Sequence, residues 1–216
     1  KAIRKLDSSI EPICINRIGA GYNDDFAVEN FASATHIRSL INKNDSFECY
    51  VPENCLSMYL DLIKSGKVVS QEKYDLSSLA LLRCRLGEDS GNVANMAEGL
   101  ENRIDEAIKT SICLNEIYDR TKTKRYTHSR IRRAVLCRQF DIKKDHLNIA
   151  VPYCRLLGFN KSCENTFGKL AGMCSLPFIT RYSDFMKMSD NNMEIIFNYE
   201  DKSTDFYNLI LSKSDV

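Results

Sequence analysis

Hydrophobic residues recur every three or four positions through the middle of the chain, from about residue 52 to residue 140. This spacing places them along one side of a helix. Pro52 and Gly66 have the residue types that begin and end a helix, and Thr127 is placed to cap a helix that runs to Phe140. The pattern therefore predicts successive helices with three apolar stripes: Leu56, Tyr59, Leu60 and Ile63; Leu76, Leu79, Leu82 and Leu86, closed by Gly87; and Met96, Leu100, Ile104 and Ile108.

The first forty residues follow a different period. Alternation around Ile13, Ile15 and Ile18 predicts a strand over residues 10–18, and a glycine-bearing loop follows over residues 19–25. A helix then begins at Ser33 and ends near Asn42. A strand, a loop and a capped helix are parts of a nucleotide-binding α/β edge, although a complete sheet would need further strands.

The last third predicts a compact βαβ unit. A strand over residues 149–157, with Pro152 near an edge, is followed by a helix over 165–173 and a short strand over 177–180. The chain beyond Tyr182 is helical and acidic. We therefore expect a mostly helical α/β protein in three segments, namely 1–45, which carries the parts of a nucleotide-binding α/β edge; 46–145, a helical domain; and 146–216, a small α/β subdomain.

The start of the helix at Ser33 carries the groups needed to bind phosphate. Ser33 can accept a hydrogen bond from an amide two or three residues on, which leaves the amides of Thr35 and His36 beside the positive end of the helix dipole. Arg38 can add a forked donor. An ordinary capped helix is the alternative interpretation, and Gly19 and Gly21 alone are weak evidence for a phosphate loop.

Charge is distributed unevenly although the formal net charge is only +1. Residues 122–138 contain seven Lys or Arg and no acid, so the rest of the chain sums to −6 (+1 − 7). Such a segment can follow an RNA backbone, with Tyr126 and His128 offering rings for stacking, or it can be a solvated helix face. Ile131, Ala134, Val135 and Arg138 share a stripe that would pack inward. The candidate RNA contacts are Lys122, Lys124, Arg125, Tyr126, Arg130 and Arg133.

The cysteines, the histidines and the lengths of the apolar runs exclude several classes of protein and of site. The nine cysteines form no CxxC pair, which favours a reducing cytoplasmic location over a disulfide scaffold. The three histidines lie far apart in the sequence, so we predict no metal site and identify no catalytic residue. No apolar run is long enough to span a bilayer, so no membrane partner is expected. Gly99 interrupts a helical pattern. Such a glycine usually permits close packing or a helix start, and we favour a domain junction at this position.

Taken together, the motifs resemble the bacterial tRNA(Met) cytidine acetate ligase family, which is related to the HIGH-type nucleotidyltransferases. The resemblance covers roughly residues 1–180 and rests on Lys1–Ile3, Ser9–Pro12, Arg17–Tyr22, Phe31–Arg38, Glu98–Arg103, Lys122–Tyr126 and Leu157–Asn160. It implies that residues 1–45 are the C-terminal end of a Rossmann-like nucleotidyltransferase domain. It also implies that ATP, as its magnesium complex, activates acetate as acetyl-adenylate, and that the acetyl group passes to the wobble cytidine of elongator tRNA(Met).

The same resemblance assigns roles to individual residues. It implies that Ser33, Thr35 and Arg38 belong to a phosphate motif, that Arg17 and Ile18 contact ATP, and that the basic segment contacts tRNA. The family's HxGH signature is missing from this chain. We therefore expect a C-terminal piece of the enzyme that is inactive alone. Two other functions stay open: a nucleotidyltransferase acting on a small metabolite, and a non-catalytic RNA-binding module.

Overall fold

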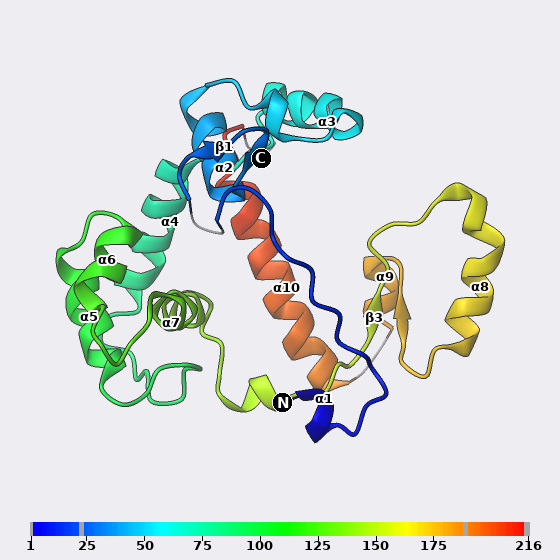
Figure 1. The fold of residues 1–216 in the computed structure, drawn as a ribbon. Helices are drawn as coiled ribbons and strands as arrows, with labels where there is room; N and C mark the ends of the chain where they lie inside the picture. The colour runs from blue at the N-terminus through cyan, green and yellow to red at the C-terminus, as the bar shows by residue number, and fades with distance from the viewer. Residues whose placement is uncertain (1, 22–23, 188–189, 214–216) are drawn as a thin grey trace. The chain divides into compact units, whose positions relative to one another are not determined.

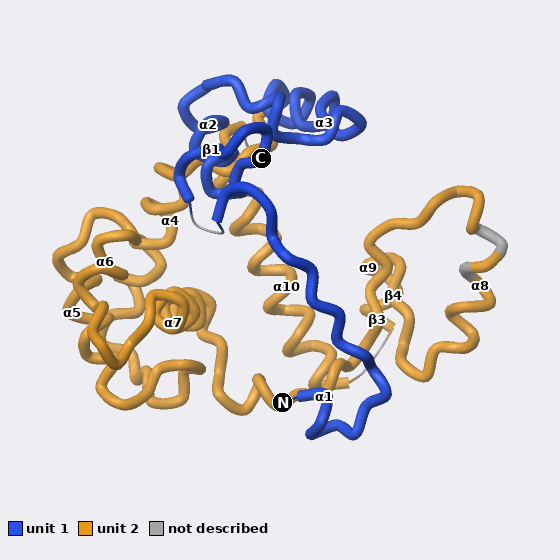
Figure 2. Tube along the Cα trace, viewed as in Figure 1, with its two compact units in different colours: residues 1–65 blue, residues 66–216 orange. Residues whose placement is uncertain are grey.

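The computed structural model describes residues 2–21, 24–187 and 190–213. It divides into two compact units, residues 1–65 and residues 66–216 (Figures 1 and 2). The observed boundary follows the helix that begins after Pro52, whereas the sequence predicted a first boundary at residue 45. Of the two predicted boundaries at 45 and 145, neither coincides with the observed one.

The first unit contains short elements around a small interior. Its buried residues are Ala20, Ser33 and Phe47. The strands β1 and β2 form an antiparallel hairpin in which Ala27 pairs with Ala32. The elements are α1 (Ala2–Lys5), β1 (Ala27–Val28), β2 (Phe31–Ala32), α2 (Ala34–Lys43), the 3-10 helix η1 (Glu48–Tyr50) and α3 (Glu53–Lys64).

The predicted strand over residues 10–18 is wrong. These residues form no helix or strand, and Ile13, Ile15 and Ile18 are 84%, 87% and 76% exposed. A strand obtains its backbone hydrogen bonds from a neighbouring strand, and no described residue pairs with this segment. Alternation in the sequence was therefore not sufficient to form a strand here. Tyr22 and Asn23 of the predicted loop, and Lys1 of the first motif, lie outside the described residues.

The core of the second unit is built from helices, all of which the sequence predicted except the one over Leu114–Thr121. Helix α5 packs against α6 and α4, and α7 packs against α4 and α6. Their apolar stripes meet in one core that includes Leu82, Leu100, Ile104 and Ile131. Leu76 is a correction, because it is 70% exposed although the predicted stripe included it. The helices are α4 (Gln71–Cys84), α5 (Leu100–Thr110), α6 (Leu114–Thr121) and α7 (His128–Phe140).

Gly99 marks the beginning of α5. It is the N-cap residue, with φ +82°, a left-handed conformation that glycine adopts without strain. Because Gly99 lies inside the second unit, it is a helix start and does not separate the two units. Met96 therefore precedes the helix in which the periodicity had included it, although its side chain is buried in the core.

The predicted βαβ arrangement is present in reduced form. Strand β3 pairs in parallel with β4, in the register Cys154 with Phe178 and Arg155 with Ile179, and α8 connects them. The strand predicted over 149–157 shrinks to two residues. Pro152 lacks a backbone N–H group, which limits pairing at its start. The elements are η2 (Asp145–Asn148), β3 (Cys154–Arg155), η3 (Lys161–Cys163), α8 (Glu164–Met173), β4 (Phe178–Ile179), α9 (Tyr182–Phe185) and α10 (Asn191–Leu209).

A second apolar cluster joins this βαβ region to α10. It contains Tyr153, Ile179, Phe185, Met193 and Phe197, and the rings of Phe185 and Phe197 stack with centroids 3.8 Å apart. Among the described residues, no helix has both the length and the apolar character required to cross a membrane.

Candidate functional site

Helix α2 begins with the cap that the sequence predicted. The Ser33 backbone is extended, and its Oγ accepts a hydrogen bond from the amide of His36 at 3.0 Å. The same hydroxyl donates to the carbonyl of Asp24 at 2.5 Å. Ser33 is completely buried. The one proton of the hydroxyl is therefore used inside the protein, so the side chain of Ser33 positions the helix start and has no donor left for a phosphate.

The glycine loop is held against this helix start. The amide of Gly21 donates to Oδ2 of Asp24 at 2.6 Å, so Asp24 binds the loop with its side chain and Ser33 with its carbonyl. Gly19 has φ +84°, and a Cβ atom there would lie 2.5 Å from Cβ of Phe31. Glycine is therefore needed at position 19 for two reasons, backbone conformation and close approach to β2.

Two backbone amides remain available at the start of α2. His36 was expected to be one of them, but its amide is the one that Ser33 binds. The amides of Ala34 and Thr35 have no hydrogen-bond partner among the described residues. Nη2 of Arg38 lies 3.5 Å from Oγ1 of Thr35, and both side chains are exposed. Two amides, a hydroxyl and a guanidinium thus gather at the positive end of the helix dipole, which suits an anion.

Arg17 and Ile18 precede the glycine loop. Nε of Arg17 donates to the carbonyl of Ala20 at 2.8 Å, which ties the arginine to the loop. The other four N–H donors of its guanidinium remain available to a ligand. Ile18 is 76% exposed, so its contribution to a nucleotide site would be apolar contact or backbone groups.

The basic segment lies in the second unit and leads into α7. Thr127 caps this helix by accepting from the amide of Arg130, as predicted. The predicted inward stripe is confirmed, because Ile131, Ala134, Val135 and Arg138 are all buried. Arg138 donates from Nη2 to the carbonyls of Arg85 and Glu88, and because it is only 1% exposed it is unavailable to an external ligand.

The prediction that Tyr126 stacks on an RNA base is wrong. Its side chain was predicted to offer a ring for base stacking, but it is only 5% exposed and belongs to the core. Its hydroxyl donates to the carbonyl of Glu98 at 2.5 Å, and the guanidinium carbons of Arg125 and Arg130 lie 5.8 and 5.2 Å from the ring centroid. Tyr126 anchors the segment and orients two arginines through cation–π contacts.

Glu98 is a partner that the sequence reasoning did not identify. Its Oε2 lies 3.3 Å from Nη2 of Arg125 and 3.2 Å from Nη2 of Arg130. Glu98 precedes Arg125 by 27 positions and Arg130 by 32, and periodicity within one helix carries no information about such a pairing. One carboxylate therefore offsets part of the charge of two candidate RNA contacts.

The other basic side chains differ in how free they are. Lys124 and Arg133 are exposed and have no ion-pair partner among the described residues. Lys122 donates from Nζ to the carbonyls of Thr123 and Tyr126, within its own turn. The guanidinium carbon of Arg132 lies 5.3 Å from the centroid of the Tyr118 ring. Burial raises the pKa of Tyr118, so that ring stays neutral beneath the arginine.

A model of the family described as HIGH Nucleotidyl Transferase matches residues 1–216. The chain belongs to the HIGH nucleotidyl transferase family. The match covers both units, which confirms the resemblance to HIGH-type enzymes inferred from the motifs.

Relatives named "tRNA(Met) cytidine acetate ligase" are similar over most of the chain. The protein of Thermosipho melanesiensis is 37% identical over 188 residues, which cover 85% of this chain and 44% of that relative. A protein of Clostridium kluyveri is 35% identical over 190 residues, which cover 84% of this chain and 46% of the relative. The chain thus spans about half the length of the relatives it matches.

Solved structures share the fold. The crystal structure of apo Thermotoga maritima TmcAL matches 99% of this chain and 54% of that chain, with a TM-score of 0.82 and 24% sequence identity. A structure of the same protein bound with alpha-thio ATP gives a TM-score of 0.81 and 23% identity. At this identity the comparison shows that the fold is shared.

Proposed function

We propose that the protein containing this chain is an ATP-dependent ligase that acetylates the wobble cytidine of elongator tRNA(Met). The observation that carries the proposal is the similarity to relatives named tRNA(Met) cytidine acetate ligase, at 37% and 35% identity. Because the chain covers less than half of those two relatives, we propose the activity for the whole protein and not for these 216 residues alone.

In the first step, an acetate oxygen attacks the α-phosphorus of ATP, and pyrophosphate leaves. The start of α2 would bind the phosphates through the amides of Ala34 and Thr35 and the guanidinium of Arg38, which stabilise the charge that develops as pyrophosphate departs. Arg17 and Ile18 would border the nucleotide. Mg²⁺ would accompany the phosphates as part of the ATP complex.

In the second step, the N4 amine of cytidine attacks the acetyl carbonyl, AMP leaves, and the amine loses a proton to solvent. The basic segment would hold the tRNA backbone. Lys124 and Arg133 are the free cations in this proposal, and Arg125 and Arg130 share Glu98. Lys122 would contribute charge at the start of the segment, whereas the buried ring of Tyr126 would act through the arginines above it.

The direct test uses the full-length protein with ATP, labelled acetate and a tRNA(Met) transcript. The expected results are acetate-dependent pyrophosphate release and N4-acetylcytidine at the wobble position, detected by mass spectrometry. A transcript with uridine at that position is the matched control and should stay unacetylated. Release of pyrophosphate without acetylated tRNA would contradict the proposal.

A second candidate function is a nucleotidyltransferase that acts on a small metabolite and never binds RNA. The family description favours it, because it names nucleotidyl transfer and no RNA. Arg138 is buried, but the other six positive charges over residues 122–138 lie at least partly at the surface and argue for RNA instead. The absence of measurable tRNA binding by the full-length protein would support the metabolite enzyme.

A further inference from the structure

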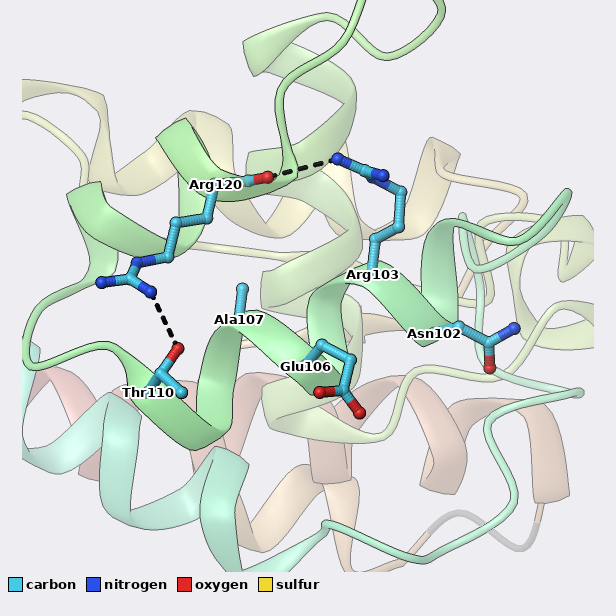
Figure 3. A pocket seen from close by; sticks show the side chains of 6 residues that line it. All are labelled: Asn102, Arg103, Glu106, Ala107, Thr110 and Arg120. Atoms are coloured by element: carbon cyan, nitrogen blue, oxygen red, sulfur yellow. Dashed lines mark hydrogen bonds between the residues drawn. The ribbon is translucent and has the colours of Figure 1, made fainter.

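A groove of about 470 Å³ lies along α5 and α6 in the second unit. It belongs neither to the start of α2 nor to the basic segment described above. Figure 3 shows the side chains that line it, which are Asn102, Arg103, Glu106, Ala107, Thr110 and Arg120.

Two arginines border the groove at separate places. Nη2 of Arg103 donates to the carbonyl of Arg120 at 3.3 Å, and Nη1 of Arg120 donates to Oγ1 of Thr110 at 3.0 Å. Figure 3 shows their side chains extending in different directions, with the short side chain of Ala107 between them. Each guanidinium has five N–H donors, so both retain donors for a ligand.

The side chains that line the groove carry a net positive charge. Its one acidic lining residue, Glu106, is paired with Lys109 at 2.6 Å, so its charge is balanced by a residue outside the lining. Arg120 has a loose ion pair with Glu116 at 3.9 Å, and its side chain is 53% exposed. An anionic ligand would therefore find two accessible, incompletely neutralised guanidinium groups.

One residue that lines the groove lies just before the basic segment in the sequence. Arg120 lies in the last turn of α6, and Lys122 is the C-cap of that helix. The carbonyl that Arg103 binds belongs to this last turn. A strand bound to residues 122–133 can therefore extend past the end of α6 toward Arg120 and Arg103.

We propose that the α5–α6 groove binds a phosphate–ribose unit of the same RNA strand that contacts the basic segment. This inference rests on the proposed function, because it takes RNA as the partner. The two arginines bind phosphate oxygens as forked donors, and the amide of Asn102 provides a donor and an acceptor for a ribose hydroxyl. Two separated arginines suit successive positions on an extended strand better than the single terminal phosphate of a free nucleotide.

The test measures binding of labelled tRNA(Met) to the full-length protein at several salt concentrations. The double variant Arg103→Ala, Arg120→Ala should bind about tenfold more weakly near physiological salt, with a salt slope flatter by up to about one unit per lost phosphate contact. The matched control is Lys67→Ala with Lys202→Ala, which removes two exposed positive charges elsewhere in the same unit. It should bind close to wild type.

A second variant keeps both arginines and changes an exposed side chain. Asn102→Glu places a negative charge in the groove, so it should weaken tRNA binding several-fold while thermal unfolding stays unchanged. Wild-type binding by this variant and by the double variant would overturn the inference.

Two further outcomes separate the sources of failure. If replacing Lys124, Arg125, Arg130 and Arg133 by Ala weakens tRNA binding but the groove variants do not, the groove inference fails and the proposed function stands. If the wild-type protein does not bind tRNA(Met), both fail. Adenosine monophosphate is the probe for a free-nucleotide site: its binding to wild type but not to the double variant, with equal tRNA affinities, would overturn the assignment to RNA.

Discussion

Helices α2 and α7 begin with the same kind of N-cap, but they differ in how deeply the cap and the helix are buried. Each helix begins with a hydroxyl residue that accepts a hydrogen bond from the amide three positions on, Ser33 from His36 and Thr127 from Arg130. Ser33 is fully buried and α2 has no buried residue, whereas Thr127 is exposed and α7 has six buried residues. Helix α2 is therefore held mainly by the hydrogen bonds of its cap, and α7 is held mainly by the packing of its buried face.

This difference explains why the two helix starts suit different ligands. At α2 the cap and the glycine loop fix the backbone, so amide groups can be presented to a small anion. At α7 the core fixes the helix, so long cationic side chains can be presented along a polyanion. The same capping signal thus contributes to either kind of site, and burial decides which groups face outward.

The largest expected effect tests how α7 is fixed. Ile131→Ala should lower the free energy of unfolding of the second unit by about 2–5 kcal/mol, because its completely buried side chain leaves a cavity. The matched change in α2, Ile37→Ala, should cost about 1 kcal/mol, since Ile37 is only partly buried. Hydrogen exchange of peptides from each helix measures the two effects separately. Equal costs would contradict the comparison.

The next effect concerns the caps. Ser33→Ala should destabilise α2 by about 1–2 kcal/mol, because it removes the bond from His36 and leaves the carbonyl of Asp24 without its donor. Thr127→Ala should cost less, about 0.5–1 kcal/mol, since its side chain is exposed and α7 keeps its packed face. The exchange rates of the first-turn amides in each variant provide the measurement. A larger loss at Thr127 would reverse the assignment of which helix depends on its cap.

A smaller expected effect distinguishes the proposed ATP site at α2 from the proposed tRNA site at α7. In the full-length protein, Arg38→Ala should reduce acetate-dependent pyrophosphate release about tenfold, which corresponds to ~1.4 kcal/mol, and leave tRNA(Met) affinity near wild type. Lys43→Ala removes an exposed charge from the last turn of the same helix and serves as the control. Unchanged pyrophosphate release in the Arg38 variant would remove this residue from the mechanism.

The features predicted correctly from the sequence are local ones. Caps at Ser33 and Thr127, the inward face of α7 and the glycine after α3 depend on residues within one or two turns of each other. Helix α6 was missed, because its eight residues are too few to show a clear period. The strand predicted around Ile13 failed for the opposite reason, since pairing requires a partner that the pattern does not specify.

The candidate sites show the same limit. The sequence predicted that Arg130 and Arg133 face outward, and the structure places Arg133 at the surface and leaves Arg130 partly exposed. It did not reveal that Glu98 binds Arg125 and Arg130, or that Tyr126 is buried beneath them. These contacts join residues about thirty positions apart, and they depend on how α5 and α7 pack in the core.

The central claim is that α7 and the turn before it present cations to tRNA. Titration of labelled tRNA(Met) against the full-length protein at several salt concentrations tests it most directly, with the variant Lys124→Ala, Arg125→Ala, Arg130→Ala, Arg133→Ala compared with wild type. We predict weaker binding and a salt slope flattened by up to about one unit for each lost phosphate contact. Wild-type affinity and slope in this variant would contradict the claim and leave the basic segment a solvated helix face.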